Sequence, residues 1–107
     1  MVKQVLTRAG FIEDETFRET KFVSPPKNET YAIYFDSFTR RGADGLNLIK
    51  EHSYTIELYA YYPDPEAEDK IEGVFDDLGL EYDKSDRTWI ESEHLYLTVY
   101  NFEHIEK

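Results

Sequence analysis

The most regular pattern in the chain is an alternation of apolar and polar residues over 52–62, HSYTIELYAYY. A period of two is typical of a strand that buries one face, so this segment is predicted to be a β-strand. The side chains predicted to face the core are Tyr54, Ile56, Leu58, Ala60 and Tyr62. The side chains predicted to face the other way are Ser53, Thr55, Glu57, Tyr59 and Tyr61.

A helical period marks the start of the chain and the segment 65–78. Near the start, apolar residues stand three and four apart, and Gly10 follows where a helix-ending residue is expected. In the second segment, Asp64 and Pro65 suit the N-cap and the first helical position, and Gly79 ends the pattern. The apolar stripes of the two predicted helices are Val2, Val5, Leu6 and Ala9, then Ala67, Ile71, Val74, Phe75 and Leu78.

Shorter strand-like runs complete the fold. Further strands are predicted at residues 18–23, 31–38, 81–83, 88–91 and 95–102. Residues 39–50 are polar and contain two glycines, so they are predicted to form a loop or hairpin tip. The order α-β-β-β-α-β-β, with a third closing strand left open, predicts an α+β fold. We expect one domain over residues 1–107, with a mainly antiparallel sheet of about four or five strands and two helices packed on it.

The last predicted strand is apolar on both of its faces. Leu95, Leu97 and Val99 face one way. Tyr96, Tyr100 and Phe102 face the other way. This pattern predicts either a central strand covered on both sides or a strand whose second face meets another chain.

The negative charge is confined to the second half of the chain. Residues 1–53 carry eight Lys/Arg and eight Asp/Glu, whereas residues 54–107 carry four and fifteen, so the formal net charge of −11 belongs to the second half. A field of this sign repels nucleic acid and attracts cationic surfaces. We therefore expect protein partners and no specific binding of nucleic acid.

Composition also bears on location. The chain has no cysteine, so it has neither a disulfide framework nor a thiolate metal site. It has no apolar run long enough for a signal peptide or for a membrane span of about 20 residues. The expected location is the cytoplasm, without membrane association.

The histidines are the first candidates for acid–base or metal chemistry. No two of His52, His94 and His104 stand at the i, i+4 spacing of a helical zinc site. Glu91, Glu93 and His94 could be drawn as a metal cluster, but SEH is more typical of a polar turn between strands. We expect no metal site and no cofactor.

Catalytic motifs are absent from the sequence. There is no GxSxG or GxGxxG, and RRGADG lacks the Lys and Ser/Thr of a phosphate-binding loop. Neighbouring carboxylates on the second helix, such as Glu66 and Glu68 or Asp76 and Asp77, point in different directions and predict a solvated acidic face. The protein is predicted not to be an enzyme, with no catalytic residue.

A protein interface is the better-supported kind of site. Tyrosine offers a large contact area at low rotamer cost and is enriched in interfaces. Residues 39–50 are the most cationic segment of the chain. The residues predicted to form an interface are Arg40, Arg41, Tyr59, Tyr61, Tyr96 and Tyr100. Packing of Tyr59 and Tyr61 beneath a helix of the same chain is the open alternative.

Residues 54–107, from YTIELYAYYPDPEAED to YNFEHIEK, resemble small head–tail morphogenesis proteins of long-tailed bacteriophages and prophages, and most of all the tail terminators. The resemblance implies an N-terminal helix, antiparallel strands, a second helix on the sheet and a closing strand. It also implies self-association into a hexameric ring that caps the tail tube and meets the head connector. The protein would then lie in the host cytoplasm during assembly and afterwards in the virion tail.

Two other readings remain open. A monomeric acidic module could act as a DNA mimic or as an inhibitor of a basic partner protein, and would then need its carboxylates in a continuous stripe. An enzyme would use His52 or His94 with nearby carboxylates, but no catalytic signature supports it.

Overall fold

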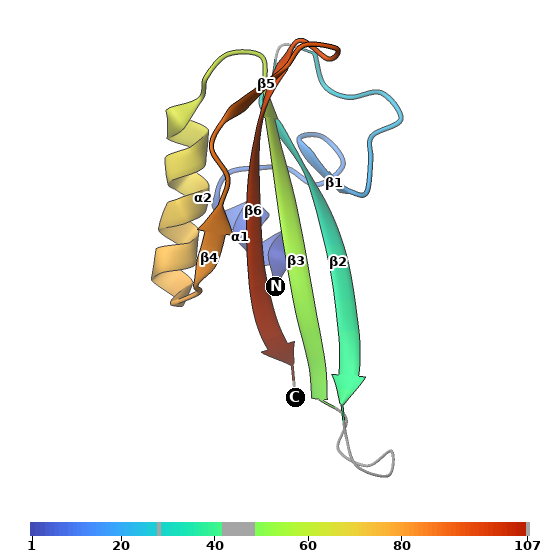
Figure 1. Ribbon diagram of the computed structural model, residues 1–107, viewed down its shortest axis with the longest axis vertical. Helices are drawn as coiled ribbons and strands as arrows, with labels where there is room; N and C mark the ends of the chain where they lie inside the picture. The colour runs from blue at the N-terminus through green and yellow to red at the C-terminus, as the bar shows by residue number, and fades with distance from the viewer. Residues whose placement is uncertain (28, 42–48, 107) are drawn as a thin grey trace.

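The computed structural model describes the backbone of residues 1–27, 29–41 and 49–106, and their side chains except those of 38–41, 49, 50, 105 and 106. It has the predicted α+β class, with two helices and a six-stranded, mostly antiparallel sheet (Figure 1). The helices are α1 (Val2–Arg8) and α2 (Pro65–Leu78). The strands are β1 (Phe17–Glu19), β2 (Tyr31–Arg41), β3 (Ile49–Ala60), β4 (Tyr82–Lys84), β5 (Thr88–Ile90) and β6 (Leu95–Glu106).

Three long strands form the centre of the sheet. The strand order is β1-β2-β3-β6-β4, and β5 pairs with β6 on the same side as β4 does. Only the short β1–β2 pair is parallel among the described strand pairs. Tyr34, Ile56 and Tyr100 stand in one row across the three strands. Ile33, Glu57 and Val99 stand in the next row, and their side chains point to the opposite face of the sheet.

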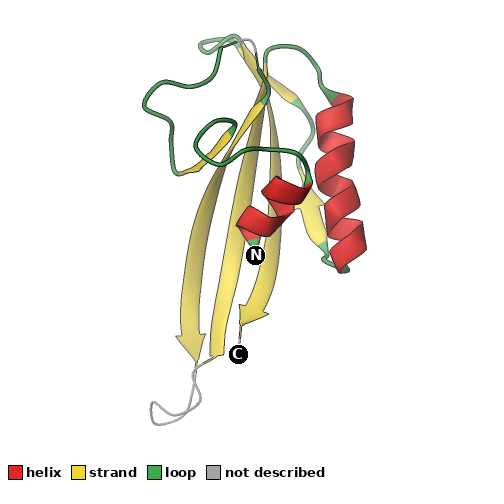
Figure 2. Ribbon diagram, turned by 180° about the vertical axis from the view of Figure 1, so that it is seen from behind, coloured by secondary structure: helices red, strands yellow, loops and turns green. Residues whose placement is uncertain are grey.

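Both helices cover one face of this sheet (Figure 2). The core between them contains side chains of β2, β3 and β6 that alternate along each strand, as the sequence predicts for β3. Phe75 of α2 packs against Tyr100 and Phe102, with ring centroids 5.9 and 4.9 Å apart. The sheet therefore has a face covered by helices, called here the helix face, and an opposite face, called here the open face.

The ends of α2 confirm the predicted capping. Asp64 is the N-cap, and its Oδ1 accepts a hydrogen bond of 3.1 Å from the backbone N–H of Ala67. Pro65 begins the helix, where a missing N–H costs nothing. Gly79 ends it at φ 67°, a left-handed conformation that a residue with a Cβ adopts at a cost. The helix at the start of the chain is confirmed in the same way, with Gly10 at φ 99° after it.

Three sequence predictions about strand length were wrong. The strand expected at 18–23 is β1 and ends at Glu19, because Thr20 takes a φ of 69° and leaves the sheet. Residues 39–41, 49 and 50 belong to strands rather than to a loop, since Arg40 pairs with Lys50. Of the predicted loop, residues 42–48 lie outside the described residues. The last strand continues to Glu106 because β3 pairs with it from Tyr96 to Glu106.

Tyr62 was also predicted wrongly. The alternation in sequence placed it in the core, but its side chain is 80% exposed. The strand β3 ends at Ala60, and the next residues bend toward α2. Once the chain leaves the sheet, the period of two no longer decides which way a side chain points.

Candidate functional site: the open face of the sheet

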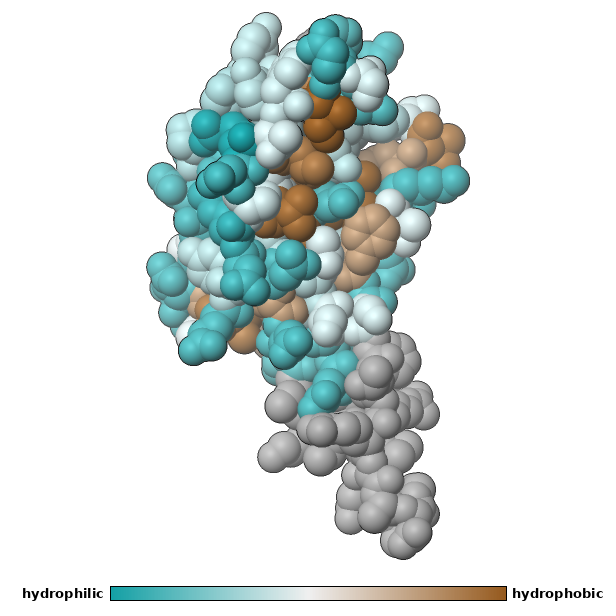
Figure 3. Space-filling model, viewed as in Figure 1, coloured by the Kyte–Doolittle hydropathy of each residue, from teal (hydrophilic) through white to brown (hydrophobic). Residues whose placement is uncertain are grey.

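The open face carries apolar side chains that no helix covers. On β2, Ile33 is half-buried and Phe35 is 38% exposed. On β6, Leu97 and Val99 are half-buried on the same side. Figure 3 looks onto this face and shows a run of hydrophobic residues down its middle. Such a surface is able to contact another protein by burying apolar area.

Aromatic rings stack at the upper end of the open face. Tyr31 and Tyr59 are cross-strand partners with ring centroids 5.2 Å apart and an interplanar angle of 18°. Phe22, from the segment between β1 and β2, meets Tyr31 edge-on at 5.6 Å. The Tyr61 hydroxyl donates to the backbone oxygen of Pro26 at 3.2 Å. The chain thus covers this end of the face with its own segment and leaves the middle open.

A half-buried hydrogen bond orders the centre of the same face. The Tyr59 hydroxyl donates to Oε1 of Glu57 at 2.9 Å. Burial, and then this hydrogen bond, raise the pKa of Tyr59 well above its usual range. The phenol therefore stays a neutral donor, and Glu57 has a fixed partner between the apolar side chains of Ile33 and Val99.

The structure separates the predicted interface residues. Tyr59 lies on the open face, stacked on Tyr31, so the alternative that a helix covers it is wrong for this ring. Tyr61 lies beyond the end of β3 and donates to the backbone oxygen of Pro26. Tyr96 lies in the helix-face register, half-buried, with its ring 4.9 Å from that of Trp89. Arg40 and Arg41 end β2, and their side chains lie outside the described residues.

Tyr100 is part of the core. Its side chain is fully buried, and its hydroxyl donates to Oε2 of Glu72 at 2.8 Å. Burial, and then the hydrogen bond to Glu72, raise the pKa of Tyr100 far above its usual range. The predicted interface role of Tyr100 is therefore wrong for the folded chain, because α2 occupies the surface that this ring would offer.

The sequence analysis did not predict the ion-pair network that joins α2 to the segment after it. Glu68 was predicted to lie on a solvated face, but it is 6% exposed. Its carboxylate pairs with Nε of Arg87 at 2.7 Å and with Nζ of Lys84 at 2.9 Å. Lys84 also pairs with Glu72 at 2.8 Å. The sequence did contain an indication of this network, since Lys84 and Arg87 are the only Lys and Arg residues between residues 71 and 106, a segment with many carboxylates.

Burial on its own raises the pKa of Glu68. The hydrogen bonds from Arg87 and Lys84 outweigh that effect, and they hold the pKa of Glu68 below its usual value. Each of the four charges in the network has a partner of opposite sign. The network fastens the β4–β5 segment to α2.

Two of the histidines have defined neighbours or backbone conformations in the fold. His52 is 8% exposed, its Nδ1 lies 2.9 Å from Oδ1 of Asp36, and its ring stacks on Tyr54. His94 sits in the β5–β6 turn with a φ of 53°. In the part of the chain that the structure describes, no three His, Asp or Glu side chains are placed to hold a metal ion.

Comparison with known proteins adds no family. The chain matches no model of a protein family, and it has no significant match among curated proteins. Among the described residues, no helix is long and apolar enough to cross a membrane.

Proposed function

We propose that this protein is a structural assembly protein of the tail-terminator kind, which forms a ring that caps a phage tail tube and joins it to the head. The observation that carries the proposal is the open face of the sheet. It presents half-buried apolar side chains on two of the three central strands, with no helix over them. A surface of this kind is suited to contact with another chain.

The order of elements supports the same proposal. The chain runs from a short helix through antiparallel strands to a second helix packed on the sheet and a long closing strand. This is the order that the resemblance to tail terminators implies. The three central strands also extend beyond both helices, which gives the molecule a long arm (Figure 1). An arm of this kind can reach a neighbour in an assembly.

The distribution of charge favours assembly over the acidic mimic. A mimic of nucleic acid needs its carboxylates in one continuous stripe. Here Glu68 and Glu72 turn toward Lys84 and Arg87, and the exposed carboxylates are divided among α2, the β4–β5 segment and β6. An acidic ring lumen would repel DNA and let it pass, which is compatible with carboxylates spread in this way.

Electron microscopy of the purified protein, alone and with a polymerising tail-tube protein, tests the proposal. We expect rings in the first sample and tubes with one capped end in the second. The double variant Ile33→Lys/Val99→Lys changes only half-buried positions of the open face and sets opposite charges beside Glu57, so it should fold but bind tubes poorly. Salt-sensitive binding of a basic protein by a persistent monomer would favour the acidic mimic instead.

A further inference from the structure

Glu57 places a negative charge in the middle of the apolar open face. It is half-buried on β3, between Ile33 of β2 and Val99 of β6. Its Oε1 accepts from the neutral hydroxyl of Tyr59, and no described Lys or Arg pairs with it. A partner that covered this face without a cation would bury the charge unpaired, which is costly. The occupant of the open face must therefore bring a positive charge to Glu57.

The open face itself carries a cation in the same row of the sheet. Arg18 of β1 is the register partner of Ile33, which pairs in turn with Glu57. Register partners point to the same face of a sheet. A second contact agrees, since the guanidinium carbon of Arg18 lies 6.0 Å from the centre of the Phe22 ring, and Phe22 packs on Tyr31 of the open face. The face thus presents charges of opposite sign two strands apart.

Arg18 is able to contact a carboxylate of another chain. Its side chain is 41% exposed, and its Nε lies 3.3 Å from Oδ1 of Asp14. An exposed pair of this kind contributes little to stability. A guanidinium has five N–H donors, so Arg18 can hold a second carboxylate without losing the first.

We infer that the open face binds the open face of a second copy of this chain, with Arg18 of each copy against Glu57 of the other. A two-fold axis that runs parallel to the strands above β2 produces this contact, because it places β1 of one copy opposite β3 of the other. Stacked sheets lie about 10 Å apart, a gap that an extended arginine and a glutamate span together. This inference rests on the proposed function and assigns the occupant of the face that carries it.

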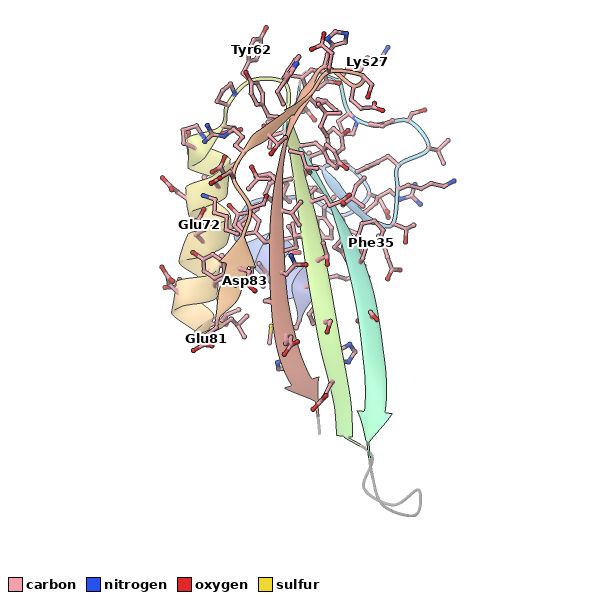
Figure 4. All side chains as sticks on the ribbon, in the orientation of Figure 1. Lys27, Phe35, Tyr62, Glu72, Glu81 and Asp83 are labelled. Carbon is pink, nitrogen blue, oxygen red and sulfur yellow. The ribbon has the colours of Figure 1, made fainter. Side chains whose placement is uncertain are left out.

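The same axis brings together the apolar side chains of β2. An axis along β2 keeps each residue at its own level, so Ile33 and Phe35 of one copy face the same residues of the other. Phe35 is exposed in the single chain, and Figure 4 shows it on β2, well apart from α2. A two-fold axis across the strands would instead pack β3 on β3 and leave each Glu57 without a cation. A ring that contains the inferred contact has an even number of copies, as a hexamer does.

Charge reversal tests the contact. The variants Arg18→Glu and Glu57→Arg each set like charges against one another at both pairs. Each alone should associate about tenfold or more weakly than the wild type in native mass spectrometry. An equimolar mixture of the two should form mixed pairs, and the double variant Arg18→Glu/Glu57→Arg should pair with itself, because every contact then joins opposite charges. Urea denaturation shows whether each variant is folded.

A matched control separates this contact from the effect of net charge. Lys70 and Glu66 form an exposed ion pair of 3.4 Å on α2, which covers the helix face. The variants Lys70→Glu and Glu66→Arg make the same charge changes as the two reversals on the open face. Neither control variant should weaken association.

Cysteine substitution tests the position of the axis, since the chain has no cysteine of its own. A short bismaleimide should join two copies of the Ile33→Cys variant, because this position lies beside the axis. The Val99→Cys variant should cross-link poorly. Val99 lies two strands from β2, so its two copies stand four strand spacings, about 19 Å, apart across the sheets.

The outcomes separate this inference from the proposed function. Association that survives both reversals, a mixture that forms no mixed pairs, or equal cross-linking of the two cysteine variants would overturn the inference and leave the proposed function standing. A wild type that is monomeric alone but caps tail tubes would do the same and would make the tube protein the occupant. Pairing as described, without any capping of tubes, would overturn the proposed function instead.

Discussion

Nε of Arg87 lies 2.7 Å from Oε2 of Glu68, a carboxylate that is only 6% exposed although it belongs to the first turns of an acidic helix. With Lys84 on the other oxygen of Glu68, this pair holds the β4–β5 segment against α2. The segment forms one wall of a groove of about 1040 Å³ that lies beside β6. The ion pairs therefore hold one wall of this groove in place.

Removal of the charge of Glu68 should weaken the fold. The variant Glu68→Gln keeps the shape of the side chain but loses the charge that Arg87 and Lys84 share, so we expect the free energy of unfolding to fall by about 1–2 kcal/mol. Urea denaturation measures this loss. The matched change Glu66→Gln lies at an exposed position of the same helix and should alter stability by less than about 0.5 kcal/mol. Equal effects of the two changes would contradict the assigned network.

The same network predicts a dependence on pH. Because the pKa of Glu68 is lower in the folded chain than its usual value of 4.5, its contribution is present above that value. It is lost as the pH falls through the lower pKa of the folded state. The stability difference between wild type and Glu68→Gln should therefore be constant near neutral pH and shrink below about pH 4.5. A difference that grows on acidification would contradict the sign of the shift.

The buried hydroxyl of Tyr100 should contribute to stability through its bond to Glu72. The variant Tyr100→Phe keeps the ring packing and removes the donor, which should cost about 1 kcal/mol. Thermal unfolding followed by circular dichroism provides the measurement. The half-buried Tyr96 lies outside the core cluster and serves as the control, so Tyr96→Phe should have a smaller effect.

The N-cap of α2 makes a further prediction. Asp64 accepts hydrogen bonds from the backbone of Ala67 and from the hydroxyl of Thr30, at 3.1 and 2.6 Å. We expect Asp64→Ala to destabilise the fold by about 1–2 kcal/mol, and Asp64→Asn to retain most of the cap. Chemical denaturation of both variants checks this order. If Asn were as damaging as Ala, the cap would not be the source of the effect.

The sequence was sufficient where local rules decide the structure. Asp64, Pro65 and Gly79 fixed the ends of α2, because capping depends on residues next to one another in the chain. Alternation likewise identified the face of β3 that bears Ile56 and Leu58. These features need no knowledge of distant contacts.

The remaining features depend on contacts between distant segments. Glu68 is buried because residues 84 and 87 fold back onto α2, and helical periodicity contains no information about that return. The strand β4 covers only part of β6, and the register between the two strands decides which part. For the same reason, the pattern of β6 could not tell whether Tyr100 would meet a helix or another chain.

The mass of the purified wild-type protein in solution tests the central claim most directly. Light scattering coupled to size-exclusion chromatography measures this mass over a rising range of concentration. Our account predicts a multiple of 12.7 kDa that corresponds to a closed ring. A mass of 12.7 kDa at every concentration, unchanged by added tail-tube protein, would contradict it.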